Sequence, residues 1–158
     1  MPFQSPICRT RRLFLALVLL LGSFGCATTA SLSKDGLKTR EVIGVVESLR
    51  KAYEGKELNA LASLFSWKDP SEEKEFRDQV EEDWKGTKEI RLTTTIDRIL
   101  FEKDRVSVSF FWEAAWKKET PERVGQGQGD VVLFLSDTEP TRVVRFTGDP
   151  PWLSQHTR

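Results

Sequence analysis

Histidine and cysteine are scarce in this sequence of 158 residues, which contains one histidine and two cysteines. His156 stands near the C-terminus, where we expect a solvated tail rather than a catalytic site. Metal sites built from histidine or cysteine need several such side chains at short spacings, and the sequence has no such cluster. We therefore expect neither a metal ion nor a cofactor.

Long hydrophobic runs are also missing, because the longest apolar stretch, residues 13–21, has nine residues. A membrane-spanning helix needs about 20. Three arginines precede this stretch, and the small or polar run 22–25, with one Phe, separates it from Cys26. A positive segment, a short apolar segment and small residues are typical of a signal peptide for export. The sequence thus predicts a signal peptide over residues 1–25 rather than a retained membrane anchor.

The pair Gly25-Cys26 at the end of this leader resembles the cleavage site of bacterial lipoprotein precursors. The resemblance implies that Cys26 becomes the first mature residue and carries acyl chains such as palmitate, which hold the protein in a membrane. Ala27 implies sorting to the outer membrane of the bacterial cell envelope, on its periplasmic face. Cleavage near Ala27 or Ala30 by an ordinary signal peptidase is the alternative. Because Cys8 is lost with the leader, we expect no disulfide.

Charge of one sign is not in excess, since 24 Lys and Arg balance 24 Asp and Glu. The three leader arginines are the only charged residues before Cys26, so the mature chain has 21 Lys and Arg against 24 Asp and Glu, a net charge of −3. Nucleic-acid binding requires a basic patch or stripe. We therefore expect no nucleic-acid partner.

Helical periodicity dominates the first half of the mature chain. Residues 26–37 are mostly small and polar, and we expect a flexible tether there, followed by a single domain over residues 38–158. Apolar residues then recur at the spacing of a helix face in three segments, the third starting at the cap-like run Asp69-Pro70-Ser71-Glu72. These residues are Val42, Val46, Leu49 and Tyr53, then Leu58, Leu61, Leu64 and Phe65, then Phe76, Val80 and Trp84.

After residue 88 the apolar period changes to two, and turn-like segments at 102–104, 119–122 and 137–140 divide the rest into four strands. Treating each break as a hairpin predicts a register with one apolar or glycine-rich face, which the helices cover. The predicted fold is α+β, with N-terminal helices packed on a curved four-stranded antiparallel sheet. The middle hairpin pairs Val106 with Leu135, Val108 with Leu133, Phe110 with Val131, Trp112 with Gly129, Ala114 with Gly127 and Trp116 with Gly125. The first hairpin places Leu100, Arg98, Ile96, Thr94, Leu92 and Ile90 beside residues 106 to 116. The last adds Arg142, Val144, Phe146 and Gly148, with Gly148 next to Gly129.

The segment 45–65 carries a resemblance to a known superfamily. It contains a helix ending in glycine, the pair Glu57-Leu58, and a second helix ending in Leu64-Phe65. With the strand order and the closing run 146–149, it resembles the nuclear transport factor 2-like superfamily, whose fold is a cystatin-like cone. The resemblance implies association through the outer face of the sheet. The ketosteroid isomerases of this superfamily use a tyrosine and carboxylates. The sole tyrosine, Tyr53, lies near the end of the first predicted helix, where we expect it to pack among apolar residues. That activity is therefore not carried over.

Small residues and tryptophans share the predicted inner face of the sheet. Gly127 and Gly129 leave space that is either an apolar pocket or is filled by tryptophan rings, since aromatic rings cover glycines in sheets. An apolar small ligand in such a pocket is expected to contact Trp84, Thr94, Trp112, Trp116 and Trp152.

Carboxylates are missing from this predicted inner face, where the polar residues are Thr94, Arg98 and Arg142. Asp97 and Glu113 are expected at exposed strand positions, and the acidic run 81–83 on the solvated side of the third helix. Acid–base catalysis needs such a group within reach of the substrate. We therefore expect no catalytic residue and no enzyme.

The outer face of the predicted sheet carries an apolar patch. Neighbouring apolar side chains of this kind tend to mark interfaces, so we expect a homodimer or an envelope protein to bind at Phe111, Val132, Phe134 and Val143. The resulting hypothesis is a non-enzymatic envelope lipoprotein that binds a protein partner or an apolar small molecule. The alternative is an enzyme of isomerase or lyase type, acting on a hydrophobic substrate inside the cone.

Overall fold

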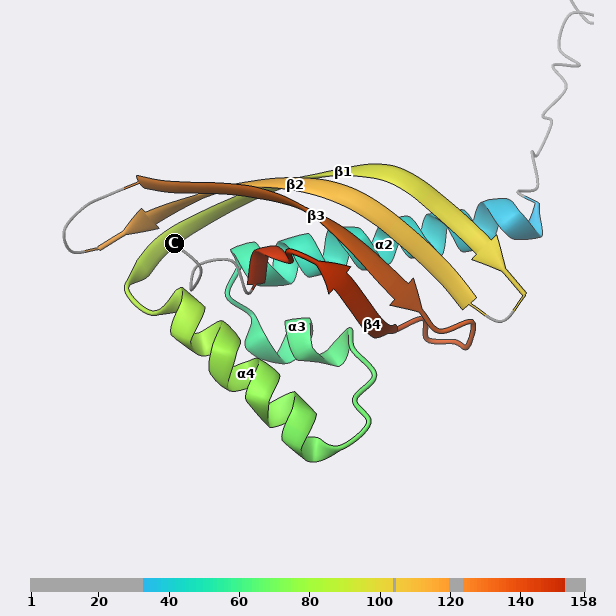
Figure 1. Cartoon of the computed structure of the whole chain (residues 1–158), viewed down its shortest axis with the longest axis horizontal. Helices are drawn as coiled ribbons and strands as arrows, with labels where there is room; N and C mark the ends of the chain where they lie inside the picture. Colours follow the sequence, from blue (N-terminus) through green and yellow to red (C-terminus); the bar gives the residue numbers. More distant parts are fainter. Residues whose placement is uncertain (1–32, 104, 120–123, 153–158) are drawn as a thin grey trace, which may run out of the picture. The chain divides into compact units, whose positions relative to one another are not determined.

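The computed structural model describes residues 33–103, 105–119 and 124–152. Three helices are followed by a four-stranded antiparallel sheet, as predicted. Figure 1 shows the sheet curving over the helices, which all lie on its concave face. The predicted signal peptide and Cys26 fall outside the described residues. No helix within them is both long and apolar enough to cross a membrane.

The first described helix, α2 (Lys34–Glu54), begins before the predicted domain boundary, because Ser33 caps it by accepting a hydrogen bond from the Gly36 N–H at 3.1 Å. Residues 34–37 are thus helical, and the prediction of a tether as far as residue 37 was wrong there. The predicted apolar face is buried. Gly55 caps the C-terminal end of the helix, as expected from a glycine after the apolar run. On its flank Glu54 accepts a hydrogen bond from the Leu92 N–H at 2.7 Å, which ties α2 to the sheet.

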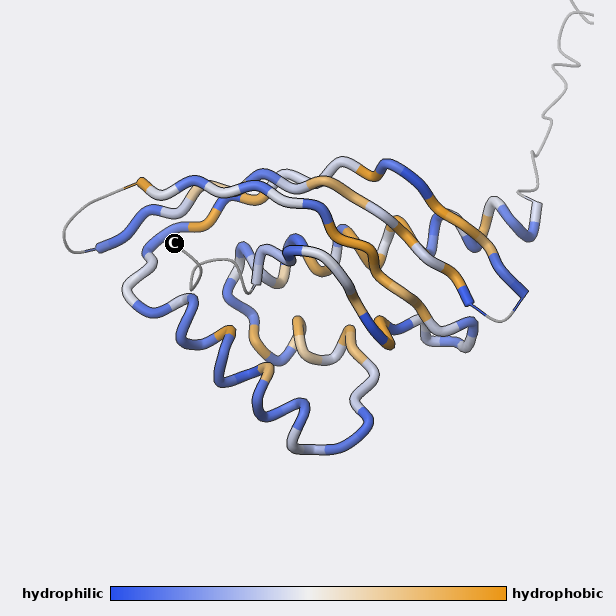
Figure 2. The backbone as a smooth tube through the Cα atoms, in the orientation of Figure 1, coloured by the Kyte–Doolittle hydropathy of each residue, from blue (hydrophilic) through white to orange (hydrophobic). Residues whose placement is uncertain are grey.

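The other two helices, α3 (Leu58–Ser63) and α4 (Pro70–Trp84), lie where the sequence places them. The Asp69 carboxylate accepts hydrogen bonds from the N–H groups of Ser71 at 2.8 Å and Glu72 at 3.1 Å, so it satisfies backbone donors of the first turn of α4. Figure 2 shows α4 as mainly hydrophilic with isolated apolar positions, which is the pattern of a helix that buries one face.

The sheet runs in the order β1 (Thr87–Glu102), β2 (Arg105–Lys118), β3 (Val124–Leu135) and β4 (Val143–Gly148). All six predicted pairs between β2 and β3 are confirmed. Between β1 and β2, the four pairs from Ile90 to Ile96 are confirmed, and then an irregularity shifts the register between Ile96 and Arg98. Because of this bulge, Ile99 and Phe101 take the predicted places of Arg98 and Leu100 opposite Val108 and Val106.

The predicted register of β4 was wrong. Gly148 pairs with Val131 rather than Gly129, and a second irregularity places Val143 opposite Leu135. Arg142, predicted on the inner face, is exposed, and so is Val144. A single extra residue in a strand reverses the faces of the residues beyond it.

Candidate functional site

The predicted ligand-binding residues do lie inside the cone, but they pack in separate groups. Trp112 and Trp116 meet edge to face on β2, with ring centroids 6.4 Å apart. Trp152, in the turn after β4, packs against Phe65 and Phe146, and Trp84 at the end of α4 contacts Tyr53. These four tryptophans are buried, and Thr94 is half-buried.

Tryptophan rings occupy the space above the glycines of β3. A β-carbon at Gly127 would lie 2.6 Å from a ring atom of Trp116, and one at Gly129 would lie 3.0 Å from the indole nitrogen of Trp112. That nitrogen donates a hydrogen bond to the Asp149 carbonyl oxygen at 2.6 Å, which fixes the ring. Of the two alternatives left open by the sequence, this geometry supports the packed interior.

One carboxylate inside the domain was not predicted. Asp83, which we expected on the solvated side of α4, is only 2% exposed. It follows Phe76 by seven residues and therefore lies on the same helix face. Its position within an acidic run concealed this spacing. Buried carboxylates are candidates for proton transfer. Asp97 and Glu113 are exposed, as predicted. Arg98, predicted on the inner face, is exposed as well.

Among the described residues, the outer face of the sheet bears no helix, since α2, α3 and α4 all lie on the opposite side (Figure 1). Phe111, Val132 and Phe134 lie on it half-buried. The Arg145 guanidinium lies 4.3 Å from the centroid of the Phe134 ring, a favourable cation–π distance. Val143, which we also expected on this face, is 1% exposed and belongs to the core, because the β4 irregularity turns it inward.

Beyond Phe111 the same face becomes polar around a hollow of about 540 Å³. Ala115 forms its floor, because it stands between Arg91 and Gln126 in neighbouring strands. Arg91 donates a hydrogen bond to Glu89 at 2.8 Å, which lowers the pKa of that carboxyl group. The outer face therefore has an apolar end and a polar end. The other residues around the hollow are Thr93, Glu113, Ala114, Gly127 and Gln128.

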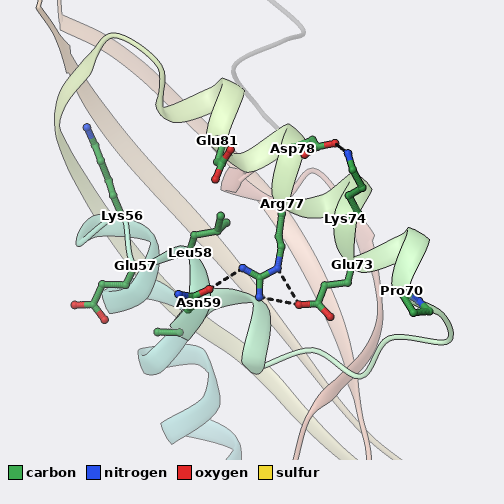
Figure 3. Close-up of a pocket in the computed structure, with 11 residues that line it drawn as sticks. Lys56, Glu57, Leu58, Asn59, Pro70, Glu73, Lys74, Arg77, Asp78 and Glu81 are labelled. Atoms are coloured by element: carbon green, nitrogen blue, oxygen red, sulfur yellow. Dashed lines mark hydrogen bonds and ion pairs between the residues drawn. The ribbon is translucent and has the colours of Figure 1, made fainter.

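A charged groove of about 910 Å³ runs between α3 and α4 (Figure 3). Arg77 donates hydrogen bonds to Glu73 at 2.8 Å and to Asn59 at 2.9 Å, and Lys74 pairs with Asp78. Arg77 and Lys74 are thus engaged by neighbouring acceptors. The sequence did not predict this groove. Within the described ranges, no group of three or more His, Cys, Asp and Glu side chains could hold a metal ion.

Comparison with known proteins finds the same architecture elsewhere. No family model and no curated protein matches the sequence. Among solved structures, a proposed dehydratase of the nuclear transport factor 2-like family from Streptomyces avermitilis is similar, with 11% identity and a TM-score of 0.61 over 71% of this chain and 95% of that chain. A hexachlorocyclohexane dehydrochlorinase has 13% identity and a TM-score of 0.58, over 71% and 84%.

A protein of the nuclear transport factor 2-like superfamily from Salmonella enterica is also similar, with 11% identity and a TM-score of 0.56 over 71% of this chain and 89% of that chain. At such identities the likeness concerns the fold alone. Together with the order of three helices and a four-stranded antiparallel sheet, these matches show that the domain has the nuclear transport factor 2-like fold.

Proposed function

We propose that this protein is a non-enzymatic, lipid-anchored protein of the bacterial cell envelope that binds a second copy or another envelope protein through the outer face of its sheet. The observation that carries the proposal is the outer face, on which Phe111, Val132 and Phe134 lie half-buried and which no helix of the described part of the chain covers. Aromatic residues together with arginine are enriched at protein interfaces. The Phe134 and Arg145 pair fits that composition.

An apolar small ligand inside the cone is a weaker alternative, because tryptophan rings cover Gly127 and Gly129. The enzyme alternative depends on Asp83, the buried carboxylate. A proton-transfer residue needs space beside it for a substrate. The two hollows described above are lined by other residues, so binding at the outer face has the stronger support.

Replacing Phe134 by glutamate is expected to weaken association at least 100-fold, because a charge at the centre of an apolar contact costs about 3 kcal/mol or more. Sedimentation of parent and variant in the same detergent measures the effect. Ile43→Glu is the matched control, since Ile43 is an exposed residue of α2 in the helix layer. A parent protein that remains a monomer at high concentration contradicts self-association. In that case cross-linking in intact cells must give an adduct with another protein that Phe134→Glu removes.

Anchoring through Cys26 would keep the domain near the membrane. Six residues separate Cys26 from the helix cap at Ser33, so the seven steps between them span at most roughly 25 Å at about 3.5 Å each. Cys26→Ser is expected to abolish incorporation of radiolabelled palmitate in bacterial cells, because the acylated sulfur is lost. Cys8→Ser is the control and should retain the full label. Label that persists in the Cys26→Ser protein would show that lipid attachment is not at this residue.

A further inference from the structure

Strand β4 forms one edge of the sheet (Figure 1). At its first residue this edge is already paired. The Val143 N–H donates to the Leu64 carbonyl oxygen at 2.8 Å, and the Val143 carbonyl oxygen accepts from the Ser66 N–H at 2.8 Å. Within the described part of the chain, residues 144–148 make no further backbone hydrogen bond on the side away from β3. The segment Leu64–Ser66 thus shows that this edge can pair with an extended chain. It pairs with Val143 only, and does not continue along residues 144–148.

An aromatic cleft of about 300 Å³ borders the open part of this edge. Trp67 stacks on Phe65 with centroids 5.2 Å apart and contacts Phe76 at 4.9 Å. The Trp67 indole N–H donates to the Ala62 carbonyl oxygen at 3.1 Å, which fixes the ring. Phe146 contributes another aromatic wall from β4. The cleft is at the small end of the range of ligand cavities, a size that suits one large side chain better than an extended small molecule.

The edge has only part of the usual protection against pairing, namely the short length of β4 and the irregularity at Val144. Natural edge strands carry lysine or proline, or are covered, whereas residues 143–148 contain neither lysine nor proline. Arg145 is the only charged residue of the strand, and its guanidinium lies over Phe134 on the outer face. Val144 is 46% exposed beside the cleft.

We propose that the edge of β4 binds an extended segment of a partner protein, which adds a strand beside residues 144–148 and places one large apolar side chain in the aromatic cleft. Binding of this kind draws its affinity from backbone hydrogen bonds and its specificity from the pocket for a side chain. Two acids, Glu72 and Glu75, and two cations, Lys68 and Arg145, line the cleft as well, so the match depends on the apolar side chain and the paired backbone and not on charge. This site is separate from the outer face and does not depend on the proposed function.

The test uses a phage-displayed library of random eight-residue peptides, selected on the immobilised full-length chain in detergent. We expect the enriched peptides to share a large apolar residue. The enriched peptide is then synthesised, and its affinity for the parent and for Val144→Lys is measured by titration. Because Val144→Lys places a charge at the mouth of the cleft, we expect binding at least tenfold weaker. Val124→Lys is the matched control, since Val124 is 66% exposed at the far end of β3, and it should bind as the parent does.

A second peptide of the same sequence, N-methylated at alternate residues, separates strand addition from simple burial of the side chain. This peptide should not bind, because N-methylation removes the backbone N–H groups that would donate hydrogen bonds to the edge of β4. Phe134→Glu should leave the affinity unchanged, so that failure here and failure of the proposed function are distinguishable. The proposal is overturned if no peptide is enriched, if Val144→Lys and Val124→Lys bind equally, or if the N-methylated peptide keeps its affinity.

Discussion

Gly148→Ala is expected to lower the free energy of unfolding by about 3 kcal/mol. Gly148 has a φ of +93°, a conformation that glycine adopts freely and alanine does not. A β-carbon at this position would also lie 2.2 Å from the carbonyl oxygen of Asp130, a backbone atom that cannot move without breaking the pairing of β3 with β4. The substitution therefore adds steric strain to an unfavourable backbone conformation.

Urea denaturation of the purified protein measures this loss, and Gly44→Ala is the matched control. Gly44 is exposed in the middle of α2, and a β-carbon there meets no atom within 4 Å. Alanine is preferred over glycine in a helix by up to about 1 kcal/mol, so this control should stabilise the protein. Equal effects of the two substitutions on the free energy of unfolding would mean that the backbone at Gly148, the last residue of β4, is not constrained as described.

The sequence was sufficient to predict the fold class and the central register because both depend on regular alternation. Alternate residues of β2 and β3 are apolar or glycine along their whole length, so only one pairing buries them all. Regular alternation cannot reveal a bulge. The irregularities before Arg98 and at Val144 each insert one residue, and beyond them the predicted inner and outer faces exchange. Val143 was placed on the wrong face for this reason alone.

Prediction of the candidate site failed where a polar residue occupies an apolar position. Asp83 belongs to the buried face of α4, but three consecutive acidic residues suggest a solvated surface. The aromatic cleft beside β4 could not be predicted either, because its walls come from three separate parts of the chain, around Phe65, Phe76 and Phe146. Their meeting depends on the tertiary fold.

Trp116→Ala is expected to cost about 4 kcal/mol of unfolding free energy, as removal of a buried tryptophan does in a packed core. The ring covers Gly127, where a β-carbon would come within 2.6 Å of it. Gly127→Ala should therefore cost about 1 to 3 kcal/mol in the parent protein, because it overpacks the space under the ring. In the Trp116→Ala background the same change should cost about 1 to 2 kcal/mol less, since the clashing ring is gone.

This double-mutant cycle, measured by urea denaturation, also decides between the two ways in which the cone can function. If rings fill the interior, the two substitutions are coupled, and binding must take place on the outside of the domain. If the interior is hollow, Gly127→Ala is tolerated in both backgrounds and the coupling vanishes. Space beside Trp112 and Trp116 would then admit an apolar molecule. Asp83, the buried carboxylate, would then be a candidate for proton transfer to such a molecule. The packing of one ring on one glycine therefore determines whether this domain acts through its interior or through its surface.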